Sequence, residues 1–265
     1  MLEKKSIDFY YFSGTGNTYL IVKTMKESFE KKGFVVNLKP LVNFLKDEFN
    51  DKHIIGIAFP IAALGTYPIC WEFLNKLPQT NATQVFMVDT LAEFSGGIIG
   101  PVREILRKKG FTTIGAKQIR MPSNYFVEKK HEEKNNQIIG AGKKEAQKFV
   151  EDIISGNSKW GRMPVFSDLL SFPSKSGNAW KLMRRLASIR LNKQACTQCS
   201  LCEESCSVNN IDLEPYPIIK KECQLCQKCV AVCPTEALIC ALSKKSANRF
   251  FPYRAKGVKA EELID

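Results

Sequence analysis

Two stretches of the chain, CTQCSLCEESC at residues 196–206 and CQLCQKCVAVC at residues 223–233, contain eight of its ten cysteines. Both have the spacing C-x2-C-x2-C-x3-C, and every cysteine of the first stretch returns 27 positions later in the second. Such self-similarity predicts a duplicated domain with two similar loops. Three thiolates two residues apart can reach three irons of one cubane from a tight loop, while the fourth cysteine points away from it. The spacing therefore predicts two 4Fe-4S clusters, each completed by the other stretch.

This crossed ligation assigns four cysteines to each cluster. One set is Cys196, Cys199, Cys202 and Cys233, and the other is Cys223, Cys226, Cys229 and Cys206. The spacing resembles that of bacterial ferredoxins, although Ser207 stands where that family usually has a proline. Zinc sites and disulfides are the alternatives; zinc pairs usually have longer gaps, and disulfides need an oxidising compartment. Cys70 and Cys240 lie outside both stretches, and we expect them to be small buried side chains.

At the amino end, the loop SGTGNT at residues 13–18 follows an apolar and aromatic stretch, residues 6–12, that predicts a buried strand. Apolar positions at helical spacing between Thr18 and Gly33 predict a helix directly after the loop. The N–H groups and dipole at such a helix start favour an anion. A dinucleotide fingerprint would need glycine or alanine where Tyr19 stands, and a nucleotide triphosphatase loop would need a lysine.

The loop is therefore suited to one terminal phosphate monoester, bound by hydroxyl, amide and backbone donors without a cation. Its candidate ligands are Ser13, Gly14, Thr15, Gly16, Asn17 and Thr18. It resembles the phosphate loop of flavodoxins, and this resemblance implies flavin mononucleotide (FMN) as a cofactor. An ordinary glycine turn between strand and helix is the alternative.

Strands and helices alternate through the first 155 residues. Further strands are predicted at 53–59, 83–88 and 112–119, and helices at 68–76, 100–109 and 137–154. This alternation predicts an α/β fold, a flavodoxin-like doubly wound parallel five-stranded sheet. A small α+β two-4Fe-4S ferredoxin-like domain is expected to follow it.

Two loops at the carboxyl ends of the strands are expected to wall the flavin ring, because ligands of such sheets bind there. Their candidate residues are Pro60, Ile61, Ala62, Ala63, Leu64, Gly65, Thr90, Leu91, Phe94, Gly96 and Gly97. Flavodoxins commonly stack an aromatic ring on the flavin, and residues 61–64 offer none. Tyr67 and Phe94 are the remaining candidates, with packing in the core as the alternative. If neither stacks, one face of the ring is open to a partner or a small substrate.

Composition sets the remaining expectations. The chain has 265 residues, 44% of them hydrophobic, and a formal net charge of +12. We see no signal peptide and no uninterrupted apolar segment that could span a bilayer, so a cytoplasmic protein is expected. Basic residues alternate with apolar ones across residues 181–193. They predict either a docking face for an acidic redox partner or an amphipathic helix packed between domains, and no nucleic-acid reading motif accompanies them.

Four segments are expected: a flavodoxin-like domain at 1–155, an ordered connector at 156–189, the cluster domain at 190–242 and a tail at 243–265. The connector contains Trp160 and Trp180, so we expect it to lie against the first domain. The tail is expected to be ordered only around residues 250–253.

The whole chain resembles the flavodoxin–ferredoxin fusion proteins of anaerobic bacteria and archaea, over residues 1–155 and 190–242. Residues 121–125 look like a segment that lies close to the flavin in those proteins. The resemblance implies electron transfer between FMN and two clusters, with protein redox partners. No acid/base dyad or nucleophile–histidine pattern is visible, so no catalytic residue is assigned. An FMN-dependent reductase of a small molecule is the alternative.

Overall fold

A parallel sheet forms the centre of the structure, a computed structural model that describes residues 5–44, 49–93, 97–125, 132–161, 171–241 and 252–264. Its strands are β1 (Ser6–Tyr11), β2 (Val35–Pro40), β3 (Ile54–Pro60), β4 (Gln84–Leu91) and β5 (Thr112–Arg120). They are all parallel and pair in the order β2-β1-β3-β4-β5. This is the flavodoxin-like order, in which the strand sequence reverses between β1 and β3. The predicted α/β fold class is confirmed.

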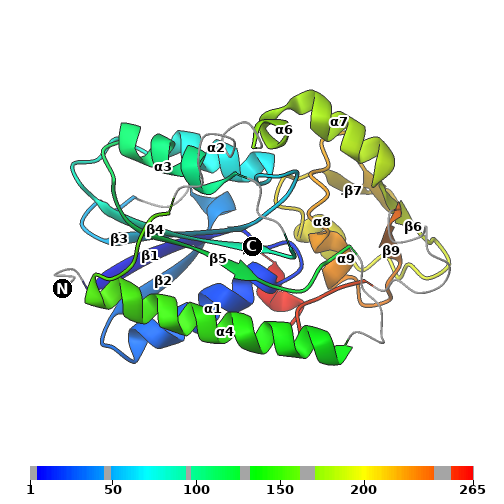
Figure 1. Cartoon of the computed structure of the whole chain (residues 1–265). Helices are drawn as coiled ribbons and strands as arrows, with labels where there is room; N and C mark the ends of the chain where they lie inside the picture. The colour runs from blue at the N-terminus through cyan, green and yellow to red at the C-terminus, as the bar shows by residue number, and fades with distance from the viewer. Residues whose placement is uncertain are drawn as a thin grey trace.

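Helices cover both faces of the sheet (Figure 1). One face carries α1 (Asn17–Glu30) and α4 (Glu132–Ser155), and the other carries α2 (Pro68–Lys76) and α3 (Ile99–Lys108). Alternate strand residues divide between the two layers, because side chains alternate across a strand. Phe9 and Phe86 pack with the first pair of helices, and Tyr10 and Met87 pack with the second. Helix α4 begins five residues before the predicted position 137.

Asp89, near the carboxyl end of β4, is a fully buried carboxyl group. Gln118 Nε2 donates to its Oδ2 at 3.3 Å, while Oδ1 has no hydrogen-bond partner among the described residues. Burial raises the pKa of Asp89 from 3.8 to about 8, against a smaller opposing effect of the Gln118 hydrogen bond.

Replacing Asp89 with asparagine should therefore change how stability depends on pH. Between pH 3.8 and about 8 the folded protein retains a proton that the unfolded chain releases, so wild-type stability falls as pH rises. Asp89→Asn lacks this loss. The melting temperature of Asp89→Asn minus that of wild type should increase between pH 5 and pH 9. For Glu151→Gln, which changes an exposed residue, the same difference should not depend on pH. Parallel curves for Asp89→Asn and wild type would contradict the expectation.

The cluster module follows the duplication that the cysteines predict. Its elements are β6 (Ile189–Leu191), α8 (Leu201–Glu204), β7 (Ile211–Leu213), β8 (Pro217–Ile219), α9 (Lys228–Val232) and β9 (Leu238–Cys240). Both small sheets are antiparallel, β6 with β9 and β7 with β8, so each joins a strand from each half. Residues with a left-handed backbone conformation (positive φ) also repeat at a spacing of 27. They form the pairs Gln198 and Leu225, Ser200 and Gln227, and Asn209 and Glu236. The two halves therefore have the same backbone turns.

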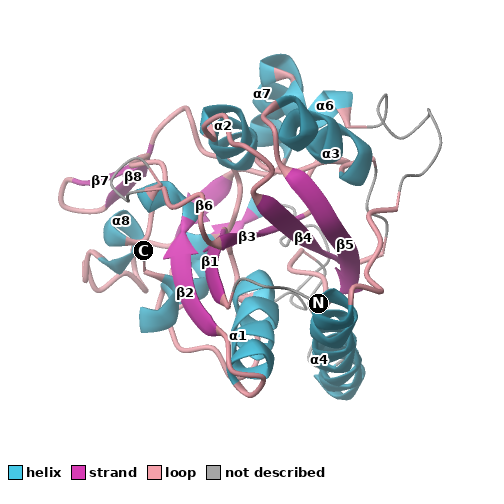
Figure 2. Ribbon diagram, turned by 90° about the vertical axis from the view of Figure 1, so that its left-hand side faces the viewer, coloured by secondary structure: helices cyan, strands magenta, loops and turns pink. Residues whose placement is uncertain are grey.

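The described parts of the connector, residues 156–161 and 171–189, pack against the sheet domain through two tryptophans, and residues 162–170 lie outside the described residues. Trp160 and Trp180 are buried in the hydrophobic core on the α2–α3 side. Two helices of the connector, α6 (Phe172–Lys175) and α7 (Gly177–Leu186), stand beside α2 and α3 (Figure 2). Leu182 and Leu186 are 57% and 56% exposed, so α7 does not bury its whole apolar stripe.

The tail differs from its prediction, because its structure extends well beyond residue 253. Residues 252–264 run along α1 and end in η4 (Glu261–Leu263). Ala255, Val258 and Leu263 are buried in the same hydrophobic core as α1 and α4. The Glu262 carboxylate also accepts hydrogen bonds from Tyr19 and Lys23 of α1. The sequence did not predict this packing, because the apolar residues of the segment are few and scattered among basic ones.

Candidate flavin and cluster sites

The loop at residues 13–18 is held in shape by its own polar side chains. Gly16 has φ of +97°, a conformation that L side chains rarely adopt. Ser13 Oγ accepts hydrogen bonds from the N–H groups of Gly16 (3.2 Å) and Tyr19 (3.3 Å). Thr18 Oγ1 lies 2.8 Å from Thr90 Oγ1 on β4. These side chains organise the loop, and the start of α1 remains the natural anion site because its N–H groups face outward along the helix axis.

Asn17 connects this loop to two distant segments. Its Nδ2 donates to the Pro122 carbonyl at 2.9 Å, and its Oδ1 accepts from the Tyr253 hydroxyl at 2.7 Å. The N–H of Ala255 also donates to the Thr15 carbonyl at 2.8 Å. The C-terminal segment thus fixes the loop from the side opposite the sheet.

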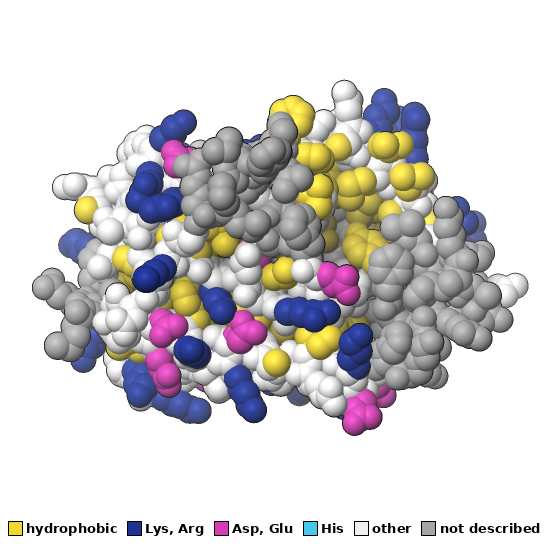
Figure 3. Space-filling view, in the orientation of Figure 1, with side chains coloured by type: hydrophobic (Ala, Val, Ile, Leu, Met, Phe, Trp, Pro, Cys, Tyr) yellow, Lys and Arg dark blue, Asp and Glu magenta, His cyan; other side chains and the backbone are white. Residues whose placement is uncertain are grey.

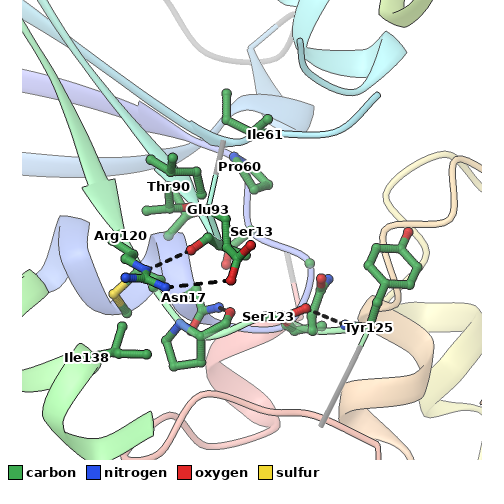
Figure 4. A pocket seen from close by; sticks show the side chains of 18 of the residues that line it. Ser13, Asn17, Pro60, Ile61, Thr90, Glu93, Arg120, Ser123, Tyr125 and Ile138 are labelled. Atoms are coloured by element: carbon green, nitrogen blue, oxygen red, sulfur yellow. Dashed lines mark hydrogen bonds and ion pairs between the residues drawn. The ribbon is translucent and has the colours of Figure 1, made fainter. Parts of the chain in front are cut away.

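A cavity of about 490 Å³ opens beside the loop, at the carboxyl ends of the strands (Figure 4). Ligand pockets of proteins commonly measure roughly 300–1,000 Å³. Of the predicted flavin-site residues, those that line the cavity are Ser13, Gly14, Thr15, Asn17, Thr18, Pro60, Ile61, Thr90 and Leu91. Residues 121–125 and Tyr67 line it as well.

Other predicted wall residues lie outside this cavity. Ala62 and Gly65 pair across a tight turn, with positive φ at Ala63 (50°) and Leu64 (62°). This turn folds away from the cavity: the Leu64 carbonyl accepts from the N–H of Gly97 at 3.3 Å, and Gly65 packs against Ser174. Phe94 and Gly96 lie outside the described residues.

The sequence reasoning missed the charged part of the cavity wall. Arg120, Glu93 and Lys134 all line it, and Arg120 Nε donates to the Ala92 carbonyl at 3.0 Å (Figure 4). Arg120 Nη2 also lies 3.7 Å from Glu93 Oε1. The position of Arg120 at the end of β5 was the available signal, because strand ends converge on the ligand site of this fold. Lys134 lies near the start of α4, and no motif marks it.

Two tyrosines stand between the cavity and the cluster module. Tyr67 is 3% exposed and packs against Phe12 and Trp180, with ring centroids 5.5 Å and 5.7 Å away. Tyr125 donates from its hydroxyl to the Leu225 carbonyl at 3.1 Å. Burial raises the pKa of both phenols, so they stay protonated and neutral at physiological pH. Tyr67 is thus a core residue that also reaches the cavity, and its stacking role remains a prediction.

The eight cysteines surround two further cavities in the sets that crossed ligation predicts. The outer cavity is lined by Cys196, Cys199, Cys202 and Cys233. The inner cavity is lined by Cys206, Cys223, Cys226 and Cys229. Within the described ranges, no three His, Cys, Asp or Glu side chains converge on a single-ion site. The thiols of each set lie around one cavity, and their role as cluster ligands stays a prediction.

Burial and backbone hydrogen bonds define the thiol environments. The N–H groups of Asn210, Leu225 and Ala237 donate to the Sγ atoms of Cys206, Cys223 and Cys233 at 3.2, 3.4 and 3.3 Å. Burial raises the pKa of Cys202 to about 11 and that of Cys226 to about 12. These thiols keep their protons until a metal binds, so loading the cavities should release protons.

The inner cavity directly adjoins the 490 Å³ cavity beside the loop at residues 13–18, which we call the flavin-type cavity. Cys226 lines both, and a Cβ on Gly14 would overlap the Cys226 carbonyl oxygen. The Gln224 side chain accepts from the N–H of Ile69 at the start of α2, at 3.1 Å. The second cysteine loop therefore lies at the carboxyl end of the sheet, against the loop at residues 13–18, which we call the phosphate-type loop.

Comparisons with known proteins found one family model and several solved structures that resemble parts of the chain. Residues 216–239 match the model of the 4Fe-4S binding domain. A flavodoxin from the domain Archaea is 13% identical, with a TM-score of 0.40, and the match covers 56% of this chain and 99% of that one. Flavodoxin 2 from Bacillus cereus is also 13% identical, with a TM-score of 0.42 and coverage of 57% and 98%. No curated protein matches the chain.

The strand order and the matched domain together define the class. The chain joins a flavodoxin-like fold to a 4Fe-4S binding domain, which is an architecture for electron transfer. This combination fits a flavodoxin–ferredoxin fusion, as its sequence predicts. No helix among the described residues has the length and apolar character needed to cross a membrane.

Proposed function

We propose that the chain binds FMN and two 4Fe-4S clusters and relays electrons between the flavin and protein redox partners. When bound, the clusters exchange single electrons and the flavin accepts one or two. The observation that carries the proposal is the sharing of Cys226 between the inner cavity and the flavin-type cavity. Because Cys226 belongs to the walls of both cavities, a cluster bound in one and an FMN bound in the other would lie close together.

The residues of the two cluster cavities suggest an order along the relay. Cys199 in the outer cavity is exposed, although Cys202 there is only 8% exposed, whereas none of the four cysteines of the inner cavity is exposed. The outer cavity is therefore suited to exchange with a partner, and the inner cavity to internal transfer. Phe12 lines the inner cavity, and Tyr125, whose hydroxyl donates to the Leu225 carbonyl, lines the cavity beside the loop at residues 13–18. Both rings therefore lie near the boundary between the two cavities.

A partner with an acidic surface fits the connector helix. Lys181, Arg185 and the two leucines Leu182 and Leu186 are exposed on α7, and Lys193 is exposed just after β6. Hydrophobic side chains gather over α6 and α7, with basic side chains beside them (Figure 3). Apolar contact surrounded by charge is suited to a transient complex, in which the charges mainly accelerate encounter.

A reductase of a small molecule is the second candidate, and the charged cavity wall is the observation that favours it. Arg120 and Lys134 bring two cations to a cavity that also contains the predicted flavin walls, and Glu93, 3.7 Å from Arg120, offsets one of them. An anionic substrate beside the flavin would be complementary to them.

Anaerobic purification with quantitation of iron, sulfide and flavin tests the cofactors. The proposal expects about eight irons, eight sulfides and one FMN per chain, as two cubanes and one flavin require. A stopped-flow measurement should then show flavin reduction through the clusters when an acidic redox protein delivers electrons. Zinc in the cysteine sites, or clusters that reduce without reaching the flavin, would contradict the relay.

A further inference from the structure

Lys228 is a buried cation beside the inner cavity. It belongs to α9, between the cysteines at 226 and 229, and only 1% of it is exposed. Its side chain lines the inner cavity, and its Nζ lies 5.6 Å from the centroid of the Phe12 ring. Burying a charge is costly unless an opposite charge or a polar group compensates it. The Lys228 charge also lowers the pKa of Cys226, so it acts electrostatically on a thiol of this cavity. A cubane with four thiolates carries net negative charge, and a cluster in the inner cavity would interact favourably with the Lys228 ammonium group.

Gln227, the preceding residue, adds a neutral amide with N–H donors to the same wall. It is 3% exposed and also lines the inner cavity. Its Nε2 is buried and has no partner at hydrogen-bond distance among the described residues, although the Gln227 side chain lies close enough to the Tyr125 phenol to lower its pKa. A buried amide donor without a partner is unfavourable in a native protein, and such groups usually have a ligand or a functional reason. Sulfur atoms in the inner cavity would be acceptors for it.

The duplication provides an internal comparison, because no described lysine lines the outer cavity and its glutamine, Gln198, is exposed. The residues 27 positions earlier are Ser200 and Leu201. Ser200 and Gln227 share the same left-handed backbone, so the two positions are structurally equivalent. Ser200 Oγ donates to the Cys199 carbonyl and to Glu204, and Leu201 is uncharged. The backbone repeat is thus kept while the electrostatics of its two halves differ.

Burial alone would make the inner cavity the harder place to add an electron. Low polarity disfavours the more highly charged state of any group, and the inner thiols are more buried than Cys199. A nearby cation and an N–H donor act in the opposite sense, since net charge and hydrogen bonds to sulfur set cluster potentials. Deepening the proposed relay, on which this inference rests, we propose that Gln227 and Lys228 raise the reduction potential of the inner cluster and so offset its burial.

Redox titration monitored by electron paramagnetic resonance tests this with Lys228→Met, which keeps the length of the side chain and removes its charge. The reduction potential of the inner cluster should fall by at least about 59 mV, which corresponds to a tenfold change in the equilibrium constant of a one-electron reduction. The outer couple should stay in place. Lys221→Met removes an exposed lysine of the same module and should move neither couple.

Further variants keep the test decisive if Lys228→Met fails to assemble. Lys228→Arg retains the charge and should retain the potential, and Gln227→Leu should lower the inner potential by a smaller amount. Leu201→Lys places a cation at the equivalent outer position and should raise the outer potential. If the inner potential is the same in all assembled variants, the inference is wrong. A wild-type protein without two clusters would instead overturn the proposed function.

Discussion

Replacing Cys206 with alanine should abolish the cluster of the inner cavity and spare the cluster of the outer cavity. Cys206 belongs to the first cysteine stretch, yet it lines the cavity formed by Cys223, Cys226 and Cys229. Loss of one thiolate ligand removes one of the iron–sulfur bonds that would hold the inner cluster. Iron content should fall from about eight to about four per chain, the number in one cubane. Electron transfer to the flavin should fall by orders of magnitude.

Cys233→Ala is the matched reciprocal variant. Cys233 belongs to the second stretch but lines the outer cavity, so this variant should lose the outer cluster and keep the inner one. Cys240→Ala removes a buried thiol that lines neither cavity and should keep all eight irons. If Cys206→Ala instead lost the outer cluster, the ligation would follow the linear order of the cysteines, and the crossed assignment would be wrong. Iron analysis and resonance spectra distinguish these outcomes.

Gly14→Ala should separate the phosphate-type loop from the cluster module. The added Cβ would overlap the backbone carbonyl of Cys226, whose carbon atom would lie 3.0 Å away. Backbone atoms cannot move aside as the end of a flexible side chain can, so both loops must shift. Overpacking in a close contact typically costs about 1–3 kcal/mol. We expect a lower melting temperature, weaker flavin retention and slower transfer between flavin and clusters.

Gly140→Ala is the control for the same change in composition. Gly140 lies within α4, and nothing stands within 4 Å of a Cβ added there. Alanine in a helix interior is favoured over glycine by roughly 0.5–1 kcal/mol, so this variant should be neutral or slightly more stable. Equal behaviour of the two variants would show that the Gly14 contact is unimportant.

The sheet and the grouping of the eight cysteines were predictable because each depends on a local pattern. The apolar stretch at residues 6–12 predicted β1 to within one residue at each end, and helical periodicity predicted that α1 follows it. The 27-residue repeat of cysteines predicted two similar loops, and the cysteines line two cavities in the predicted sets, while their role as cluster ligands stays a prediction. Spacing in the sequence directly limits which thiols can share a cavity.

The flavin-type cavity was only partly predictable, because its wall comes from segments that are distant in the sequence. The positions of Arg120 and Lys134 depend on how β5 and α4 reach the end of the sheet. The turn at Ala63 and Leu64 has positive φ without glycine, so no residue type revealed that it folds away from the cavity. The packing of residues 252–264 depends on a few apolar contacts with α1 that periodicity does not show.

The contacts of residues 252–264 have a consequence for biosynthesis. Tyr253 and Ala255 complete the surroundings of Asn17 and Thr15, yet the ribosome makes them after both cysteine stretches. During translation, the flavin-type cavity therefore gains its last supporting segment only after all eight cysteines of the two stretches have been synthesised. Iron–sulfur assembly on the nascent chain can then precede capture of the flavin, and a ribosome that stalls between these regions would leave a product with its cysteines complete and its phosphate loop unsupported.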